Sequence, residues 1–179
     1  MPLHVDACVG GFLLPWLRAL GHPIPPFDFS VDVPHPPTIP TNTTQGVASI
    51  SADIHKYGFA AKGASVILYK SNDIRKYQFL AYASWPGGLF VSPSVLGTRG
   101  GGPIAAAWTA LVHLGASGYR RETKVAMETA IYIRGKIAEM PELYILGNPH
   151  ATILAFSSKE MNIFAVADVM VIQFQEMKF

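Results

Sequence analysis

Lys56, in a loop between two apolar segments, is the side chain best suited to covalent chemistry. It lies in the stretch SADIHKYGFAAKG, which runs from Ser51 to Gly63. A lysine partly withdrawn from water has its ammonium form disfavoured, so the free amine becomes a nucleophile toward an aldehyde. Most lysines are solvated surface charges, and a His-Lys pair is common in loops. The place of Lys56 after a strand-like segment, beside His55, nevertheless favours a Schiff-base role.

Asp6 could supply the second group of a cofactor site. It lies near the end of an apolar segment in the run HVDA, where a carboxylate is costly to bury without a cationic partner. One interpretation is an exposed strand end or a cap for the following helix. The other is that Asp6 holds a protonated ring nitrogen. An amine for the aldehyde and a carboxylate for the ring nitrogen are the pair that a pyridoxal phosphate site requires.

The glycine-rich loop from Gly97 to Gly102 offers backbone N–H groups near the expected start of a helix, where phosphates bind. No Gly-Lys-Ser/Thr follows, so it is not a P-loop, and the glycines could equally form a flexible connection. The histidines lack metal-ligand spacing, so we assign them to packing or hydrogen bonding: His4, His55 and His150. No metal site is expected.

The composition is that of a folded domain with little net charge. Half of the 179 residues are hydrophobic, and the formal net charge is +2. Lysine and arginine form no stripe of the kind that binds nucleic acid. The single cysteine, Cys8, excludes an internal disulfide, and we expect it to be a small packed side chain. The longest apolar stretches, 103–116 and 163–174, are shorter than the roughly 20 residues that cross a bilayer.

Apolar periodicity and glycine-rich breaks predict alternating strands and helices. The expected strands cover residues 3–8, 47–52, 64–70, 143–146 and 152–156. The expected helices cover 12–20, 103–114 and 119–140, the last with an apolar stripe of Val125, Thr129, Ile133 and Ile137. Residues 32–44 hold four prolines and four threonines, which predicts a loop or a disordered insert. The alternation is typical of an α/β layered domain.

Five segments, in this order, resemble sphingosine-1-phosphate lyases. They are HVDACVGGF, PPFDFSV, SISADIHKYGFAAKGASVILY, WPGGLFVSPSVLGTRGGG and LGNPHATILAF. The HVDA and HKYG motifs also occur in amino-acid decarboxylases of the same pyridoxal-phosphate-dependent group II decarboxylase family. The KGASVILY and VSPSVLGTRGG segments are similar to the lyases in particular. The resemblance runs from residue 3 to about residue 170.

The resemblance implies part of the large domain of a fold-type-I pyridoxal-phosphate-dependent transferase, three-layered (α/β/α) with a mainly parallel sheet. Residues 1–140 would form the C-terminal half of that cofactor-binding domain, and 141–179 the start of a C-terminal small domain. We expect the domain to be truncated at both ends. The 32–44 insert interrupts the resemblance, as a surface loop or as translated intronic sequence, and 171–179 lies beyond it.

The resemblance also implies roles for individual residues. Lys56 would form the Schiff base with pyridoxal phosphate, Asp6 would pair with the ring nitrogen, Cys8 would pack against the ring, and His55 would lie beside the cofactor. The loop with Gly97 and Thr98 would reach the cofactor phosphate of a neighbouring subunit. Lys62 would meet the substrate phosphate, and its charge alone does not separate that role from a solvated lysine.

The implied activity is cleavage of a phosphorylated sphingoid base to a long-chain aldehyde and phosphoethanolamine, in sphingolipid catabolism. This is a carbon-carbon lyase reaction of the sphinganine-1-phosphate aldolase type. The implied assembly is a homodimer at the cytosolic side of the endoplasmic reticulum membrane, although this chain alone is expected to be soluble. Two alternatives stay open: an amino-acid decarboxylase of the same group, and a catalytically inactive fragment that acts as an interaction module.

Overall fold

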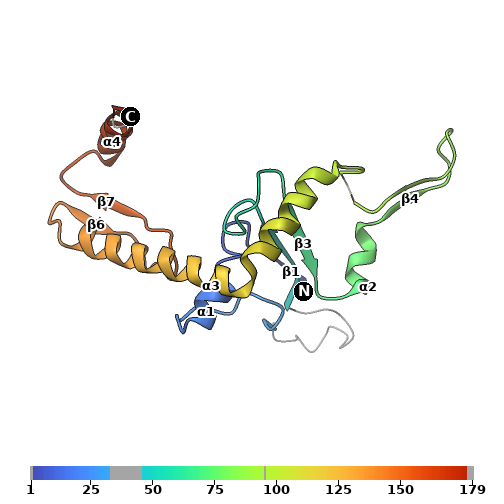
Figure 1. The fold of residues 1–179 in the computed structure, drawn as a ribbon, viewed down its shortest axis with the longest axis horizontal. Coiled ribbons are helices and arrows are strands. Elements are labelled where there is room, and N and C mark those ends of the chain that lie inside the picture. Colours follow the sequence, from blue (N-terminus) through green and yellow to red (C-terminus); the bar gives the residue numbers. More distant parts are fainter. Residues whose placement is uncertain (1, 33–45, 95, 177–179) are drawn as a thin grey trace, which may run out of the picture.

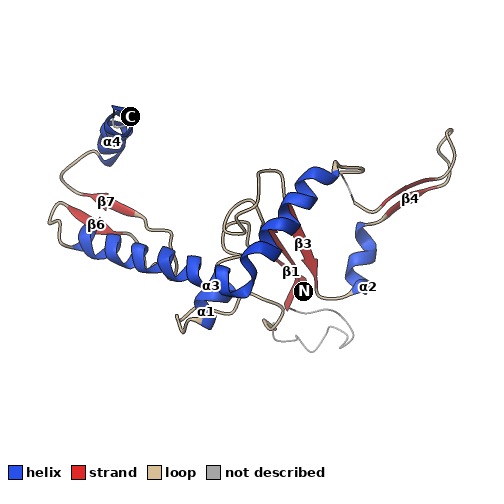
Figure 2. Ribbon diagram, in the orientation of Figure 1, coloured by secondary structure: helices blue, strands red, loops and turns tan. Residues whose placement is uncertain are grey.

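The computed structural model describes residues 2–32, 46–94 and 96–176, and the predicted 32–44 insert lies outside them except for Asp32. The strands are β1 (Pro2–Asp6), β2 (Gly46–Asp53), β3 (Ser65–Tyr69), β4 (Leu80–Tyr82), β5 (Phe90–Ser92), β6 (Leu143–Ile145) and β7 (Phe156–Ser158). The helices are α1 (Leu14–Ala19), α2 (Asn72–Arg75), the 3-10 helix η1 (Lys76–Gln78), α3 (Gly101–Ala138) and α4 (Ile163–Glu176). Figures 1 and 2 show their arrangement.

The central sheet has the strand order β1-β2-β3, which confirms the first three predicted strands. β1 and β2 are parallel, whereas β2 and β3 are antiparallel. Within the described residues the sheet is therefore mixed, and the expectation of a mainly parallel sheet is not met. The reason is the short loop from residue 54 to 64, since a parallel connection needs a crossover of about a dozen residues or more.

The two rows of side chains along β2 differ: one row is apolar and the other is polar. Its alternate residues Ala48, Ile50 and Ala52 are buried, as is Ile54 directly after the strand. The residues between them are largely polar and only half-buried, namely Ser49, Ser51 and Asp53. Side chains alternate between faces along a strand, so this pattern directs one row to the core and the other row to the polar face.

α1 and α3 pack together beside the sheet. α1 begins after Gly10-Gly11, close to the prediction for 12–20, and buries Leu17 completely. Trp16 of α1 stacks on Tyr119 of α3, with ring centroids 6.0 Å apart and planes at 5°. Such a pair adds about 0.5–1.5 kcal/mol beyond the area it buries. Farther along, Ala107 of α3 joins Ile54 in a buried cluster.

α3 joins the two helices expected at 103–114 and 119–140 into one element with a kink at Gly115. There φ is 56° and ψ is −173°, a combination open essentially only to glycine. The break turns the second half of α3 away from the sheet and along the β6-β7 hairpin (Figure 1).

The predicted apolar stripe of this second half is only partly buried. Of its members, Ile137 is buried, whereas Val125 is 54% exposed and Ile133 is 45% exposed. Ile137 belongs to a buried row that recurs every seven residues, together with Thr123 and Ala130. In the described chain, α1 packs on the start of this half, at Tyr119, and β6 also packs on α3, while Val125 and Ile133 stay uncovered.

The remaining elements project from the two ends of the structure (Figure 2). The β4-β5 hairpin extends beyond α2 and η1, and α4 lies beyond β6 and β7. The strand predicted at 152–156 is shifted along the chain, since β7 runs from Phe156 to Ser158. Gly147, with a φ of 69°, lies in the connection between β6 and β7, and next to the two strands the Leu146 N–H donates to the Ala155 carbonyl. Among the described residues, no helix is both long and apolar enough to span a membrane.

Replacing Gly115 with alanine should lower the free energy of unfolding by about 1–3 kcal/mol, because a Cβ strains the backbone at positive φ. Gly135, in an ordinary exposed part of the same helix with open space around its Cα, is the matched control. Gly135→Ala should raise the free energy of unfolding by about 0.5–1 kcal/mol. Urea unfolding followed by circular dichroism measures both, and equal changes in the two variants would contradict the kink.

Candidate functional site

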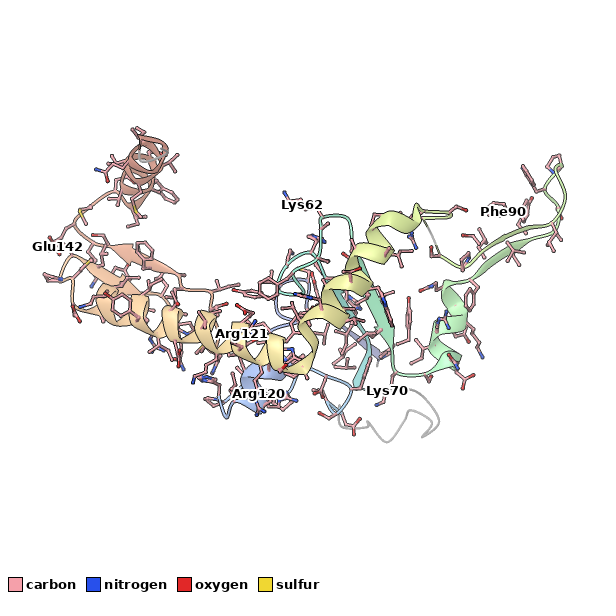
Figure 3. The ribbon with its side chains drawn as sticks, viewed as in Figure 1. Lys62, Lys70, Phe90, Arg120, Arg121 and Glu142 are labelled. Carbon is pink, nitrogen blue, oxygen red and sulfur yellow. The ribbon has the colours of Figure 1, made fainter. Side chains whose placement is uncertain are left out.

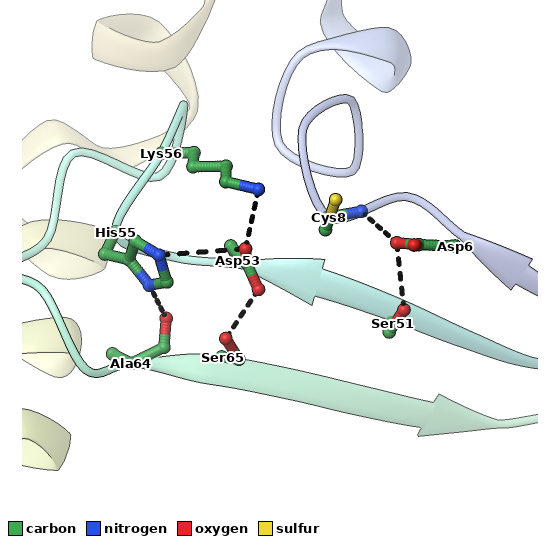
Figure 4. A network of polar contacts seen from close by, with 8 residues as sticks. All are labelled: Asp6, Cys8, Ser51, Asp53, His55, Lys56, Ala64 and Ser65. Atoms are coloured by element: carbon green, nitrogen blue, oxygen red, sulfur yellow. Dashed lines mark hydrogen bonds and ion pairs between the residues drawn. The ribbon is translucent and has the colours of Figure 1, made fainter.

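The candidate site lies where the carboxyl ends of β1 and β2 meet (Figure 4). Because the two strands are parallel, both ends open at the same edge of the sheet, where ligands commonly bind in α/β folds. Asp6 ends β1 opposite Ser51, and Asp53 ends β2. His55 and Lys56 follow directly in the loop. The sheet thus brings together residues that lie far apart in the sequence.

Asp6 is held as an ionised, exposed carboxylate. Its Oδ1 accepts a hydrogen bond from the Cys8 backbone N–H at 2.9 Å and a second from the Ser51 hydroxyl at 3.4 Å. His4 contacts Ser51 at 3.2 Å and Ser49 at 2.8 Å through its two ring nitrogens. The Cys8 N–H is the main reason that the pKa of Asp6 lies below its ordinary value. A negative charge is therefore oriented at the strand end.

Lys56 forms an ion pair with Asp53. Its Nζ lies 2.9 Å from Asp53 Oδ2, and its side chain is 36% exposed. The hydrogen bond to Asp53, followed by contact with the Cys8 thiol, raises the pKa of Lys56. The expectation that partial burial disfavours the ammonium form is wrong in this state, since the nearby carboxylate outweighs the loss of water.

Asp53 was not singled out from the sequence, although it is the acidic partner of the lysine loop. Its Oδ1 accepts a hydrogen bond from the Ser65 hydroxyl of β3 at 2.5 Å, and this bond, followed by that from Lys56, lowers the pKa of Asp53. A signal was present, because Ser49, Ser51 and Asp53 alternate with apolar residues in VASISAD. This alternation places Asp53 on the same face as Asp6.

His55 is fixed by the backbone, which confirms its assignment to hydrogen bonding. Its Nδ1 lies 2.8 Å from the carbonyl of Ala64, and a carbonyl can only accept, so Nδ1 carries the hydrogen. The other nitrogen, Nε2, lies 3.7 Å from Asp53 Oδ2. The ring therefore borders the ion pair between Asp53 and Lys56.

The loop that carries Lys56 is clamped by its own backbone and by two tyrosines. A Cβ on Gly58 would lie 2.4 Å from the carbonyl oxygen of Ile54, so only glycine fits there. The next residue, Phe59, has a φ of 57°, which is unusual for a side chain of its size. The buried Tyr119 hydroxyl donates to the Gly58 carbonyl at 2.7 Å, and the hydroxyls of Tyr57 and Thr152 lie 2.6 Å apart.

Three predicted residues lie outside this polar network. Lys62 is exposed and projects from the loop between β2 and β3 (Figure 3). Gly97, with a φ of 69°, and the exposed Thr98 lie between β5 and α3. α3 begins at Gly101, and its N-cap residue Gly100 has no side chain to cap the first N–H groups. Those groups could bind an anion, as the sequence predicted.

Solved structures define the class of the fold. A sphingosine-1-phosphate lyase from Burkholderia pseudomallei superimposes with a TM-score of 0.83 at 41% identity, covering 97% of this chain and 36% of that chain. A glutamate decarboxylase from Lactobacillus brevis does so with a TM-score of 0.72 at 19% identity, covering 97% of this chain and 37% of that chain. The fold is that of part of a pyridoxal-phosphate-dependent enzyme of fold type I.

Proteins of similar sequence show which enzymes within this fold class the chain resembles most. The sphingosine-1-phosphate lyase of Oryza sativa is 49% identical over 94% of this chain and 29% of its own length. For sphingosine-1-phosphate lyase 1 of Rattus norvegicus the identity is 42%, over 95% of this chain and 28% of the rat protein. An L-aspartate decarboxylase of Thermococcus kodakarensis is 32% identical over 90% of this chain and 38% of its own length.

The chain is a homologue of the sphingosine-1-phosphate lyases, and it spans less than a third of the length of the curated lyases that it matches. No protein-family model matches it.

Replacing Tyr119 with phenylalanine should loosen the Lys56 loop while keeping the stack on Trp16. The loss of the hydrogen bond to Gly58 should lower the free energy of unfolding by about 1–2 kcal/mol, because the buried carbonyl loses its partner. Tyr132→Phe, at a side chain that is 65% exposed, is the control and should change it by less than about 0.5 kcal/mol. Urea unfolding measures both variants, and an effect of Tyr119→Phe no larger than the control would exclude the clamp.

Proposed function

We propose that this chain supplies the cofactor-anchoring part of a pyridoxal-phosphate-dependent lyase that acts on phosphorylated sphingoid bases. The observation that carries the proposal is the placement of Asp6 and Lys56 at the adjacent carboxyl ends of β1 and β2. These are the carboxylate and the amine that this cofactor requires. The homology to sphingosine-1-phosphate lyases supports the choice of reaction.

The residues at this edge fit pyridoxal phosphate. Asp6 Oδ1 is occupied by Cys8 and Ser51, while Oδ2 accepts no hydrogen bond from any described residue and is free for a ring N–H. The low pKa of Asp6 keeps the negative charge that would hold that proton on the ring. Lys56 would bind the aldehyde group, Cys8 would pack against the ring, and His55 would border it. When bound, the cofactor supplies an electron sink for the breaking bond.

The substrate would be cleaved between C2 and C3. The C3 hydroxyl loses its proton as the carbon-carbon bond breaks, so that C3 leaves as a long-chain aldehyde. C2 takes up a proton and is released in phosphoethanolamine. The exposed cation of Lys62 is suited to the substrate phosphate, because it can reach an anion without first breaking an ion pair with a described residue.

A homodimer would complete the site. Gly97 and Thr98 lie outside the network around Asp6 and Lys56, in the connection that leads from the projecting β4-β5 hairpin into α3. We propose that this connection contributes to the cofactor phosphate site of a second subunit, where the uncapped start of α3 offers N–H donors. By the same family resemblance, we place the complete enzyme at the endoplasmic reticulum membrane.

An amino-acid decarboxylase is the second candidate, favoured by the similarity to the L-aspartate decarboxylase. Both reactions use the same lysine and carboxylate, so the cofactor site does not separate them. The difference lies in the substrate anion, which is a phosphate in one case and a carboxylate in the other. The higher identity to the lyases favours the first candidate.

Pyridoxal phosphate should become covalently attached to Lys56. The chain is incubated with the cofactor and reduced with borohydride, and the modified peptide is identified by mass spectrometry. Lys56→Ala should abolish the attachment within the peptide from Ser51 to Gly63, whereas Lys62→Ala should retain it, because Lys62 lies outside the network of Asp53 and Asp6. Modification spread over many lysines, with none favoured at Lys56, would refute the cofactor site.

The substrate class is tested by product analysis with the cofactor bound. A lyase should release a long-chain aldehyde from sphinganine 1-phosphate and no carbon dioxide from aspartate. Lys62→Ala should raise KM for the phosphorylated substrate while changing kcat less, because a cation on the phosphate aids binding at a distance from the breaking bond. Carbon dioxide release without aldehyde would favour the decarboxylase, and neither product would favour the inactive module.

A further inference from the structure

Asp53 is the carboxylate nearest to the reactive lysine, and the proposed cofactor site gives it no role. Its Oδ2 lies 2.9 Å from Lys56 Nζ, and its side chain is only 18% exposed. Asp6, which would hold the cofactor ring, is instead bonded to Ser51 and to the Cys8 N–H. The two carboxylates at the sheet edge therefore have different partners, as Figure 4 shows.

Asp53 is held rigidly enough to fix the position of the lysine. The Ser65 hydroxyl of β3 donates to its Oδ1 at 2.5 Å, and its backbone N–H donates to the Cys8 carbonyl at 3.2 Å. The Lys56 backbone N–H donates a hydrogen bond to the Asp53 carbonyl at 3.3 Å. One oxygen of the carboxylate is thus fixed by a neighbouring strand, which leaves the other directed at the amine.

We propose that Asp53 is a positioning residue for Lys56. Asp53 holds the amine of Lys56 as an ammonium ion at the shared end of β1 and β2 until the amine reacts with an aldehyde. The inference rests on the proposed function of Lys56. An ammonium nitrogen has no lone pair, so the amine must give up a proton and part from Asp53 before it can act as a nucleophile. Asp53 would thereby keep Lys56 in place in the cofactor-free protein and restrain its reaction with stray electrophiles.

Among the described residues, few charged or titratable side chains border the pair of Asp53 and Lys56. Cys8 and Asp6 face it from β1 and the residues after that strand, and His55 faces it from the loop of Lys56 itself. The pKa of Lys56 is raised, chiefly by Asp53, so the ammonium form persists to higher pH in the folded chain than in the unfolded chain. The stabilisation from this pair is complete between the ordinary pKa values of aspartate and lysine. It is lost as pH rises through the folded pKa of Lys56 and as pH falls through the folded pKa of Asp53.

The test is the pH dependence of amine labelling, residue by residue. The chain is pulse-labelled with acetic anhydride across a pH series, and acetylation of Lys56 is measured by mass spectrometry. In the folded chain, Lys56 should reach half-maximal labelling at higher pH than in the same chain unfolded in urea. Asp53→Asn, which keeps the shape of the side chain, should move this midpoint down and raise Lys56 labelling near pH 8 several-fold.

Two controls separate positioning from general loosening. Ser65→Ala removes the hydrogen bond to Asp53 and leaves the carboxylate beside Lys56, so it should shift the midpoint less than Asp53→Asn. Labelling of the exposed Lys62 should be the same in all variants. Should Asp53→Asn fail to fold by circular dichroism, concentrated salt added to the unchanged chain should lower the Lys56 midpoint, because salt screens a partly exposed pair.

An identical Lys56 midpoint in the folded and urea-unfolded chain, or one unaffected by both Asp53→Asn and salt, would overturn the inference. Capture of pyridoxal phosphate at Lys56, measured separately, distinguishes this failure from that of the proposed function. If capture occurs and the midpoint does not respond, the role of Asp53 is refuted while the cofactor site stands. If the midpoint responds and no capture occurs, Asp53 holds Lys56 as inferred and the proposed function fails.

Discussion

The parallel pairing of β1 with β2 is the constraint on which the site depends. It places the ends of both strands at one edge of the sheet, with Asp6 opposite Ser51 and Asp53 two residues farther along β2 on the same face. A slip of one residue by β2 in this register would turn Ser51 and Asp53 toward the face opposite Asp6, so the two carboxylates would no longer share a face. The buried row on β2 opposes such a slip, because it would expose Ala48, Ile50 and Ala52. Packing of the apolar face therefore fixes the geometry of the polar face.

The charged side chains at this edge of the sheet orient one another but contribute little to the stability of the fold. Partly exposed ion pairs add little to the stability of a protein, so the pair of Lys56 with Asp53 does not hold the fold together. What holds the loop is close backbone contact and a buried hydrogen bond: Gly58 approaches Ile54 closely, and the Tyr119 hydroxyl donates to the Gly58 carbonyl. The loop is thus rigid for reasons independent of its charges, which leaves its amine free to exchange one partner for another. In functional sites, the contacts that hold a reactive side chain in place are typically made by other residues than the ones that react.

Local sequence patterns predicted the elements that their own residues determine. The alternation in VASISAD and the β-branched run after it defined β2 and β3, and the motifs around Asp6 and Lys56 indicated the residues of the site. Two features depended on contacts that the sequence does not display. Asp53 became important only through its partners on β3 and in the loop, and the buried side of the second half of α3 was set by the elements that pack on it, α1 and the β6-β7 hairpin. The antiparallel direction of β3 is different, because the short loop before it already indicated that direction. The role proposed for Lys62 also depends on a contact that the sequence does not display, because its partner would be a substrate.

In the proposed site, Asp6 and Lys56 hold one cofactor between them. The most direct measurement is the nitrogen NMR signal of pyridoxal phosphate labelled at its ring nitrogen and bound to the chain, compared with the same signal in Asp6→Asn. A signal typical of a protonated ring nitrogen in the unchanged chain, moving to that of a neutral ring in the variant, is the predicted result. A neutral ring in the unchanged chain, or a protonated ring in both, would contradict the claim that Asp6 and Lys56 share one site.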